Sequence, residues 1–72
     1  MSPATPGSPP TARELAVLRA VCRPGSSVAR AAYELGIAPG TARFHLRSLY
    51  LRLEVNSAAQ ATYRIWGERE AA

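Results

Sequence analysis

A chain of 72 residues has room for one domain with a modest hydrophobic core. No apolar run approaches the roughly 20 residues that cross a bilayer, so we expect no membrane partner. The nine basic residues, all of them arginine, outnumber the five acidic ones. The resulting net charge of +4 attracts polyanions only modestly unless the basic side chains are clustered.

The first ten residues, MSPATPGSPP, hold four prolines among small and polar residues. This composition neither nucleates a helix nor builds a core, so we predict a disordered arm over residues 1–10. The arm lacks the charged start and apolar middle of a secretory leader, and the single Cys22 cannot form an internal disulfide. We therefore expect a protein of the reducing cytoplasm.

A first helix is predicted to begin at Thr11, because Thr11 and Glu14 have the spacing of a capping box, in which each side chain binds the other residue's backbone N–H. An apolar stripe follows at helical spacing, formed by Val17, Leu18, Val21 and Cys22. The Pro-Gly pair at 24–25 ends the helix. Because Cys22 lies on the stripe, we expect a small buried side chain rather than a metal ligand or a nucleophile.

The second predicted helix is short, with Ser26 or Ser27 as its N-cap and Gly36 as its left-handed stop. Its inner face is expected to consist of Val28, Ala31, Ala32 and Leu35. The two alanines allow another helix to cross closely. Ile37 is expected to close the corner to the next helix.

The third helix is predicted from Pro39, a residue well suited to a first helical position, to about Leu53. One face carries the core residues Ala42, Leu46, Leu49 and Leu53. Arg43 and Arg47, four residues apart, lie together on the opposite side. The same exposed face is expected to carry Gly40, Phe44, Ser48 and Leu51.

Ser57 and Gln60 repeat the capping spacing and predict a fourth helix to about Trp66, followed by a frayed end at residues 67–72. Its inner face is Ala58, Ala61, Thr62 and Ile65. A second, partly apolar face is formed by Ala59, Tyr63 and Trp66. A monomer of this size has little interior left to cover that face, so we predict that it pairs two copies of the chain. For Trp66, a cap on the core is an equal alternative.

No set of residues indicates catalysis. One His, one Cys, five Glu and no Asp do not assemble a convincing acid-base pair or triad, so we predict a non-enzymatic protein. His45 has no ligand type at metal-binding spacing near it and is expected to pack or to face a phosphate. We predict no metal and no cofactor. Tyr33 and Tyr50 are expected to be packing aromatics with hydrated hydroxyl groups.

The helices predicted at 28–35 and 39–53 form a pair suited to DNA. The major groove of B-DNA is about 12 Å wide and admits one helix that a second helix supports. Arg43 and Arg47 can each donate twice to guanine or to a phosphate, and Phe44 can contact a thymine methyl group. We expect Thr41 and Ser48 to anchor the flanking phosphates. The alternative is an arginine pair that is merely solvated on an exposed helix face.

Three stretches resemble the LuxR/GerE-type helix-turn-helix family: RELAVL at 13–18, ELGIAPGTARFHLRSLYLRLEV at 34–55 and AAQA at 58–61. The family pattern runs Arg-Glu-x-x-Val-Leu, Leu-Gly-Ile-Ser-x-x-Thr-Val-Lys-x-His and Lys-Leu-x-Val, and the likeness covers residues 11–66. The resemblance implies an all-α, four-helix helix-turn-helix domain whose third helix enters the major groove and whose fourth helix often pairs two subunits. Arg43, Phe44 and Arg47 fall on groove-facing positions of that pattern.

The chain departs from the family pattern at several positions. Ala38 stands where a serine commonly caps the recognition helix, which costs about 1 kcal/mol of helix stability. Glu54 replaces a glycine that closes the same helix, at a similar cost of about 1 kcal/mol if the left-handed conformation persists. Ala58 replaces an arginine and removes a phosphate contact. Weak phosphate binding by each subunit would make dimerisation or a larger partner more necessary.

These observations predict a sequence-specific regulator of transcription that binds double-stranded DNA at the nucleoid. We expect a homodimer on two half-sites about one DNA turn apart, with RNA polymerase or another regulator as a further partner. Two alternatives stay open. One is a protein resembling sigma-factor region four that works with RNA polymerase, and the other is a helix-turn-helix-derived protein-interaction module that uses Phe44 and Leu51. DNA affinity should fall steeply with salt, whereas an apolar protein contact should not.

Overall fold

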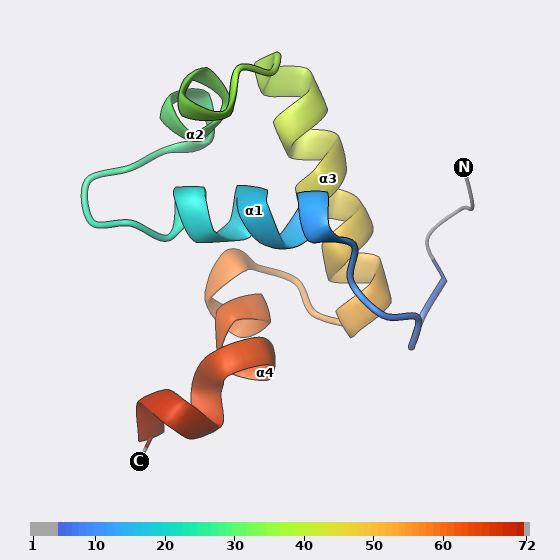
Figure 1. Ribbon diagram of the computed structural model, residues 1–72. Coiled ribbons are helices and arrows are strands. Elements are labelled where there is room, and N and C mark those ends of the chain that lie inside the picture. Colours follow the sequence, from blue (N-terminus) through green and yellow to red (C-terminus); the bar gives the residue numbers. More distant parts are fainter. Residues whose placement is uncertain (1–4, 72) are drawn as a thin grey trace.

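Residues 5–71 are described by the structure, a computed structural model, with side chains described as far as Gly67. Most of this range lies in four helices: α1 (Ala12–Val21), α2 (Val28–Leu35), α3 (Pro39–Leu53) and α4 (Ala58–Ala71) (Figure 1). No strand occurs within residues 5–71. The predicted all-α, four-helix architecture is confirmed.

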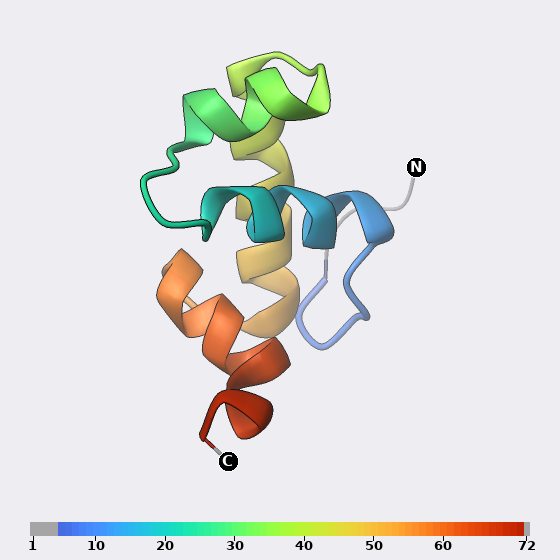
Figure 2. The same ribbon diagram turned by 60° about the vertical axis from the view of Figure 1, so that its left-hand side comes forward.

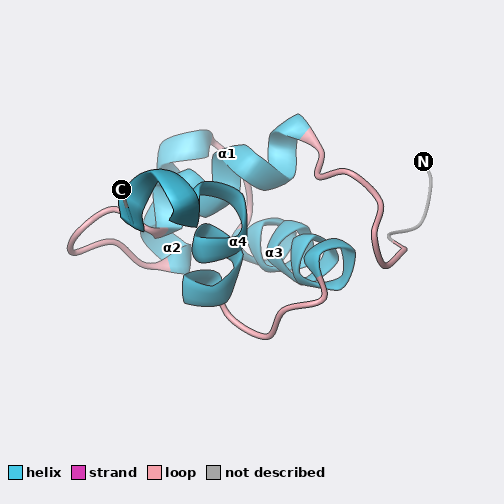
Figure 3. Cartoon of the chain, turned by 90° about the horizontal axis from the view of Figure 1, so that it is seen from below, coloured by secondary structure: helices cyan, strands magenta, loops and turns pink. Residues whose placement is uncertain are grey.

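The helices are organised around α1 and α3, which cross each other near the middle of the molecule (Figures 1 and 2). Each of these two helices contacts all three others, whereas α2 and α4 have no contact with each other in the described part of the chain. The loop between α1 and α2 lies on the opposite side of the molecule from α3 (Figures 1 and 3). One side of α3 is therefore covered by its neighbours and the other is left to solvent.

The core is built from one apolar face of each helix. Its buried side chains are Val17, Leu18, Ala32, Ala42, Leu46, Leu49 and Ala61. All of them were predicted to face inward, and the alanines let the helices approach closely. Burial of a large aliphatic side chain contributes about 1.5–3 kcal/mol. Few residues of this core are large, so polar contacts between the helices carry more weight in holding them together.

The helix ends follow local capping rules. Thr11 and Glu14 form the predicted capping box, with N–H to side-chain distances of 3.0 and 3.1 Å. Ser27 accepts a hydrogen bond from the backbone of Arg30 at 3.1 Å and caps α2, and Gly36 ends that helix with φ 71°. α3 has the predicted bounds, no side-chain cap at Ala38, and a left-handed residue after its last turn. α4 runs beyond Trp66, to Ala71.

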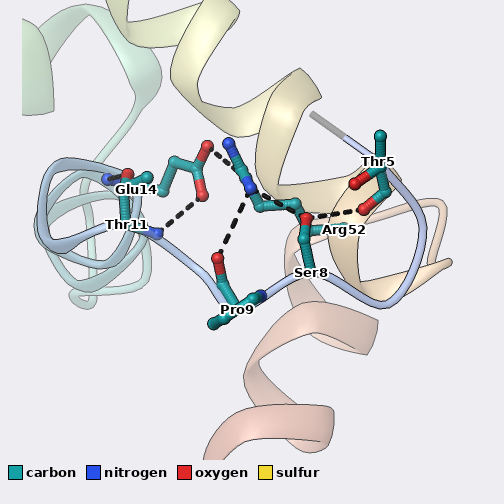
Figure 4. A network of polar contacts seen from close by, with 6 residues as sticks. All are labelled: Thr5, Ser8, Pro9, Thr11, Glu14 and Arg52. Carbon is teal, nitrogen blue, oxygen red and sulfur yellow. Dashed lines mark hydrogen bonds and ion pairs between the residues drawn. The ribbon is translucent and has the colours of Figure 1, made fainter. Parts of the chain in front are cut away.

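The segment before α1 is ordered, so the predicted disordered arm is wrong for residues 5–10. The backbone N–H of Gly7 donates to the carbonyl oxygen of Arg52 at 2.9 Å. In return, Nη1 of Arg52 donates to Oγ of Ser8 at 2.8 Å and to the carbonyl of Pro9 at 3.5 Å (Figure 4). The partner of the segment is more than forty residues away in the chain, which composition does not reveal. Residues 1–4 lie outside the described range.

The prediction that Cys22 is buried is wrong. α1 ends at Val21, and Cys22 is its C-cap, with φ −82° and ψ 0°. The apolar stripe therefore stops one residue early, and the thiol is exposed. Its Sγ atom lies 3.0 Å from Oγ1 of Thr62 in α4.

The two tyrosines that were expected to pack behave differently. Tyr50 is half-buried against the core, as predicted. Tyr33 is 86% exposed, so the expectation that it packs is wrong. The eight-residue α2 buries only the face with Ala31 and Ala32, and no described element covers the side that carries Tyr33.

Candidate nucleic-acid interface

The exposed face of α3 carries a compact set of cationic and apolar side chains. Arg43, Phe44 and Arg47 are all exposed, and Leu51 continues the same face one turn on. The opposite face of α3 buries Leu46 and Leu49. This division confirms that the arginine pair lies on the exposed face of α3. A helix that is packed along one side presents its other side to solvent in a defined orientation.

Neither Arg43 nor Arg47 forms an ion pair or hydrogen bond with any described side chain. Arg23, Arg30 and Arg52 each pair with a carboxylate, and Arg52 is held by Glu14 inside the molecule. Two guanidinium groups without an internal partner keep their donors available for an external acceptor.

The start of α3 is open to a ligand. Ala38 makes no side-chain cap hydrogen bond, so the first N–H groups of the helix lack a side-chain acceptor from that position. Apart from its chain neighbours and the backbone of α3 itself, no atom of the described chain lies within 4 Å of the place where a Cβ on Gly40 would be. Thr41 is exposed beside it. A helix N-terminus with this access favours a negatively charged group such as a phosphate.

The corner between α2 and α3 holds the exposed helix in place. Gly36 adopts the left-handed conformation, and the N–H of Ile37 donates to the carbonyl of Ala32 at 3.0 Å. Ala32 is fully buried, and Ile37 packs against the core. The corner between α2 and α3 is therefore packed against the core, with Ile37 closing it as predicted.

An aromatic contact orients the apolar part of the face. The rings of Phe44 and His45 meet edge to face, with centroids 6.0 Å apart and planes at 64°. His45 is half-buried, between the core and the exposed face, as predicted. Phe44 remains 53% exposed, so its ring edge is free to touch a ligand.

Ser48 is not part of this face, and its predicted exposure is wrong. The residue is 8% exposed. Ser48 and Arg52 lie one turn apart on the same flank of α3, and Arg52 reaches Glu14 of α1. That flank faces α1, so a hydroxyl there does not fit the expected contact with a phosphate.

Comparison with protein families decides the assignment. The model of the bacterial regulatory proteins of the luxR family matches residues 9–65, which is most of the chain and includes all of α1, α2 and α3. The chain belongs to the luxR family. No curated protein and no solved structure matches it.

The luxR-family assignment indicates the general function of this domain. The domain is a helix-turn-helix that binds DNA and regulates transcription, and it is not an enzyme. Within the described residues, no group of three or more His, Cys, Asp or Glu side chains is placed to hold a metal ion. No helix in that range is long and apolar enough to span a membrane.

The C-terminal helix of this luxR-family chain has one exposed and one covered aromatic residue. Tyr63 is 72% exposed, and Ala59 beside it is also exposed. Trp66 is half-buried and packs against the core, where the guanidinium carbon of Arg19 lies 5.2 Å from its ring centroid. Trp66 therefore caps the core, which was one of its two predicted roles. The Arg19–Trp66 contact joins α1 to α4 and had no signal in the sequence.

Proposed function

We propose that α3 lies in the major groove of duplex DNA and reads sequence there. Arg43 and Arg47 donate to base edges, Phe44 contacts a thymine methyl group, and Thr41 contacts a phosphate next to the helix N-terminus. The observation that supports this most strongly is the pair of exposed guanidinium groups without a partner among the described side chains, on a helix whose opposite face is buried. Ser48 is left out of the contact set because it is buried.

Arginine suits this role for a geometric reason. Its planar fork matches two acceptors at once, and guanine offers O6 and N7 side by side in the major groove. The four-residue spacing of Arg43 and Arg47 places both forks along one line of the helix surface. Two such groups on successive turns can reach neighbouring base pairs.

The proposal includes a homodimer formed through α4. Ala59 and Tyr63 form its exposed ridge, with a shallow groove on either side, of about 510 and 550 Å³. An exposed tyrosine between two grooves supports pairing with a second copy, because aromatic anchors that enter pockets dominate the energy of many interfaces. Two recognition helices would then meet successive major grooves about 34 Å apart.

The test of DNA reading begins with selection of bound duplexes from a random pool, which gives the preferred sequence and its symmetry. Band shifts then compare the wild type with Arg43→Ala and Arg47→Ala on the selected site. Each substitution is expected to cost about 1–3 kcal/mol, that is, about fivefold to 150-fold in affinity. Arg23→Ala is the control for the change of net charge, since Arg23 is exposed in the loop between α1 and α2 and is not part of α3.

Three results would contradict the proposal. Equal loss of affinity for Arg23→Ala and Arg43→Ala would mean that only net charge matters. A pool without any enriched sequence would mean that α3 does not read bases. Affinity that is insensitive to salt would instead favour a protein-interaction module, because phosphate contacts release counterions and weaken as salt rises.

The dimer is tested separately by sedimentation of wild type and Tyr63→Ala. We expect the wild type to form a dimer and the variant to shift to monomer, with weaker binding to a symmetric site and unchanged binding to a half-site. Identical behaviour of the two proteins would remove Tyr63 from the interface.

A further inference from the structure

A second surface lies on the side opposite α3, where the end of α1 and the following loop meet α4 (Figures 1 and 3). A shallow groove of about 430 Å³ runs between these elements. Its lining consists of Arg19, Cys22, Arg23, Pro24, Thr62 and Trp66. None of these residues belongs to the exposed face of α3, so the groove is separate from the proposed DNA contacts.

Among the described side chains, positive charge is in excess around this groove. Nη1 of Arg23 lies 3.1 Å from Oε1 of Glu34, and Nε of Arg30 lies 3.5 Å from Oε2 of the same carboxylate. Arg19 has no carboxylate partner among the described side chains and lies instead over the ring of Trp66. The Glu34 carboxylate is thus shared by two guanidinium groups, and Arg19 adds a third positive charge beside them. No acidic side chain lines the groove in the described range.

The groove also has an apolar side, and the guanidinium group of Arg19 is held against it. The Trp66 ring is only partly covered, and Pro24 is exposed at the other end of the lining. Stacking on Trp66 restrains the Arg19 guanidinium, so less side-chain entropy is lost when it binds an anion. A small molecule favours an enclosed cavity that buries most of its surface. This groove is open to solvent and therefore fits an extended peptide segment better than a small molecule.

We propose that this groove binds an acidic peptide segment of a protein partner while α3 is free to bind DNA. Carboxylates of the partner pair with Arg19 and Arg23, and an apolar side chain of the partner rests against Trp66 and Pro24. The charge excess selects an acidic ligand. The tryptophan wall favours a peptide with apolar side chains over the phosphate ridge of a second duplex, which would leave that wall without a partner.

Fluorescence provides the test, because Trp66 is the only tryptophan of the chain and lines the groove. The probe is a short synthetic peptide that alternates glutamate with leucine, titrated at low ionic strength into the wild-type protein. A saturable change of Trp66 emission is expected. The same peptide with glutamine in place of glutamate should leave the emission unchanged.

Two double variants with the same change of net charge separate the surfaces. Arg19→Gln/Arg23→Gln is expected to weaken peptide binding about tenfold and to leave DNA affinity within about twofold of wild type. Arg43→Gln/Arg47→Gln is expected to do the reverse. Equal weakening of peptide binding by both variants would reduce the effect to general charge attraction and overturn the proposal. Loss of DNA affinity alone in the Arg19/Arg23 variant would assign the groove to nucleic acid and overturn it as well.

Amide shift mapping of the wild type covers the case in which loss of Arg19 unfolds the chain. Addition of the acidic peptide should move the amide signals of Arg19, Cys22, Arg23 and Thr62 and leave those of Arg43 and Arg47 in place. Shifts confined to α3, or no shifts at all, would contradict the proposal.

Discussion

Arg52 of α3 donates a hydrogen bond from Nε to Oε2 of Glu14 in α1 over 2.9 Å, and the two side chains are only 11% and 4% exposed. The other oxygen of the same carboxylate accepts the backbone N–H of Thr11. Nη1 of Arg52 donates to Ser8 and Pro9 in the segment before α1 (Figure 4). One buried pair therefore joins the start of α1, the end of α3 and the N-terminal segment.

Loss of one partner of this pair is expected to destabilise the fold strongly. Arg52→Met leaves the Glu14 carboxylate buried without its cation, and such a loss costs about 3–5 kcal/mol. The double variant Glu14→Gln/Arg52→Met should be more stable than Arg52→Met, because it removes the unpaired charge and keeps an acceptor for the Thr11 N–H. Urea unfolding gives both free energies. A double variant less stable than the single one would show that the carboxylate tolerates isolation.

The left-handed residue at the end of α3 predicts a stabilising substitution. Glu54 has φ 57° and ψ 47°, a conformation that costs a residue with a side chain about 1–2 kcal/mol. Glu54→Gly should raise the free energy of unfolding by about 1 kcal/mol, and Gly36→Ala, at φ 71°, should lower it by about the same amount. Thermal unfolding measures both. If Glu54→Gly unfolds at a lower temperature than wild type, side-chain contacts of Glu54 outweigh the strain.

The missing N-terminal side-chain cap of α3 predicts a second stabilising substitution. The backbone of Ala38 is already extended, with φ −70° and ψ 147°, which is the conformation of an N-cap residue. In Ala38→Ser the hydroxyl can accept the N–H of Thr41, and the gain should be about 1 kcal/mol. Ser27→Ala removes the equivalent bond from α2 and should lose about as much. An unchanged unfolding midpoint for Ala38→Ser would mean that the first turn of α3 is already satisfied.

Alkaline pH should weaken the fold through Tyr50. Burial raises the pKa of the Tyr50 phenol above its usual value of 10.0, and the nearby Cys22 adds to the rise. The folded state therefore holds this proton more tightly than the unfolded state does. The contribution to stability is fully present below pH 10 and is lost as the pH rises through the folded-state pKa.

Tyr50→Phe isolates this effect. The variant should lose less stability than wild type between pH 9 and pH 11, whereas Tyr33→Phe, at an 86% exposed position, should follow the wild-type curve. Denaturant unfolding across the pH range supplies the comparison. Parallel curves for Tyr50→Phe and wild type would assign the alkaline loss to other groups.

The face of α3 was predictable because helical periodicity alone separates Arg43 and Arg47 from Leu46 and Leu49. Flanks are harder. Ser48 lies between the two faces, and only the position of α1 makes it buried. Cys22 shows the same limit at a helix end, since a stripe predicts burial only while the helix continues.

The sequence by itself determined the four helices, their caps and the cationic face of α3, because each of these depends on residues within about four positions of one another. Only the tertiary structure decided which distant groups meet. Glu14 finds Arg52 across 38 positions, Ser8 finds the same guanidinium across 44, and Cys22 meets Thr62 across 40. Such partners follow from how the helices cross, and the crossing is set by packing of the whole core rather than by any local pattern.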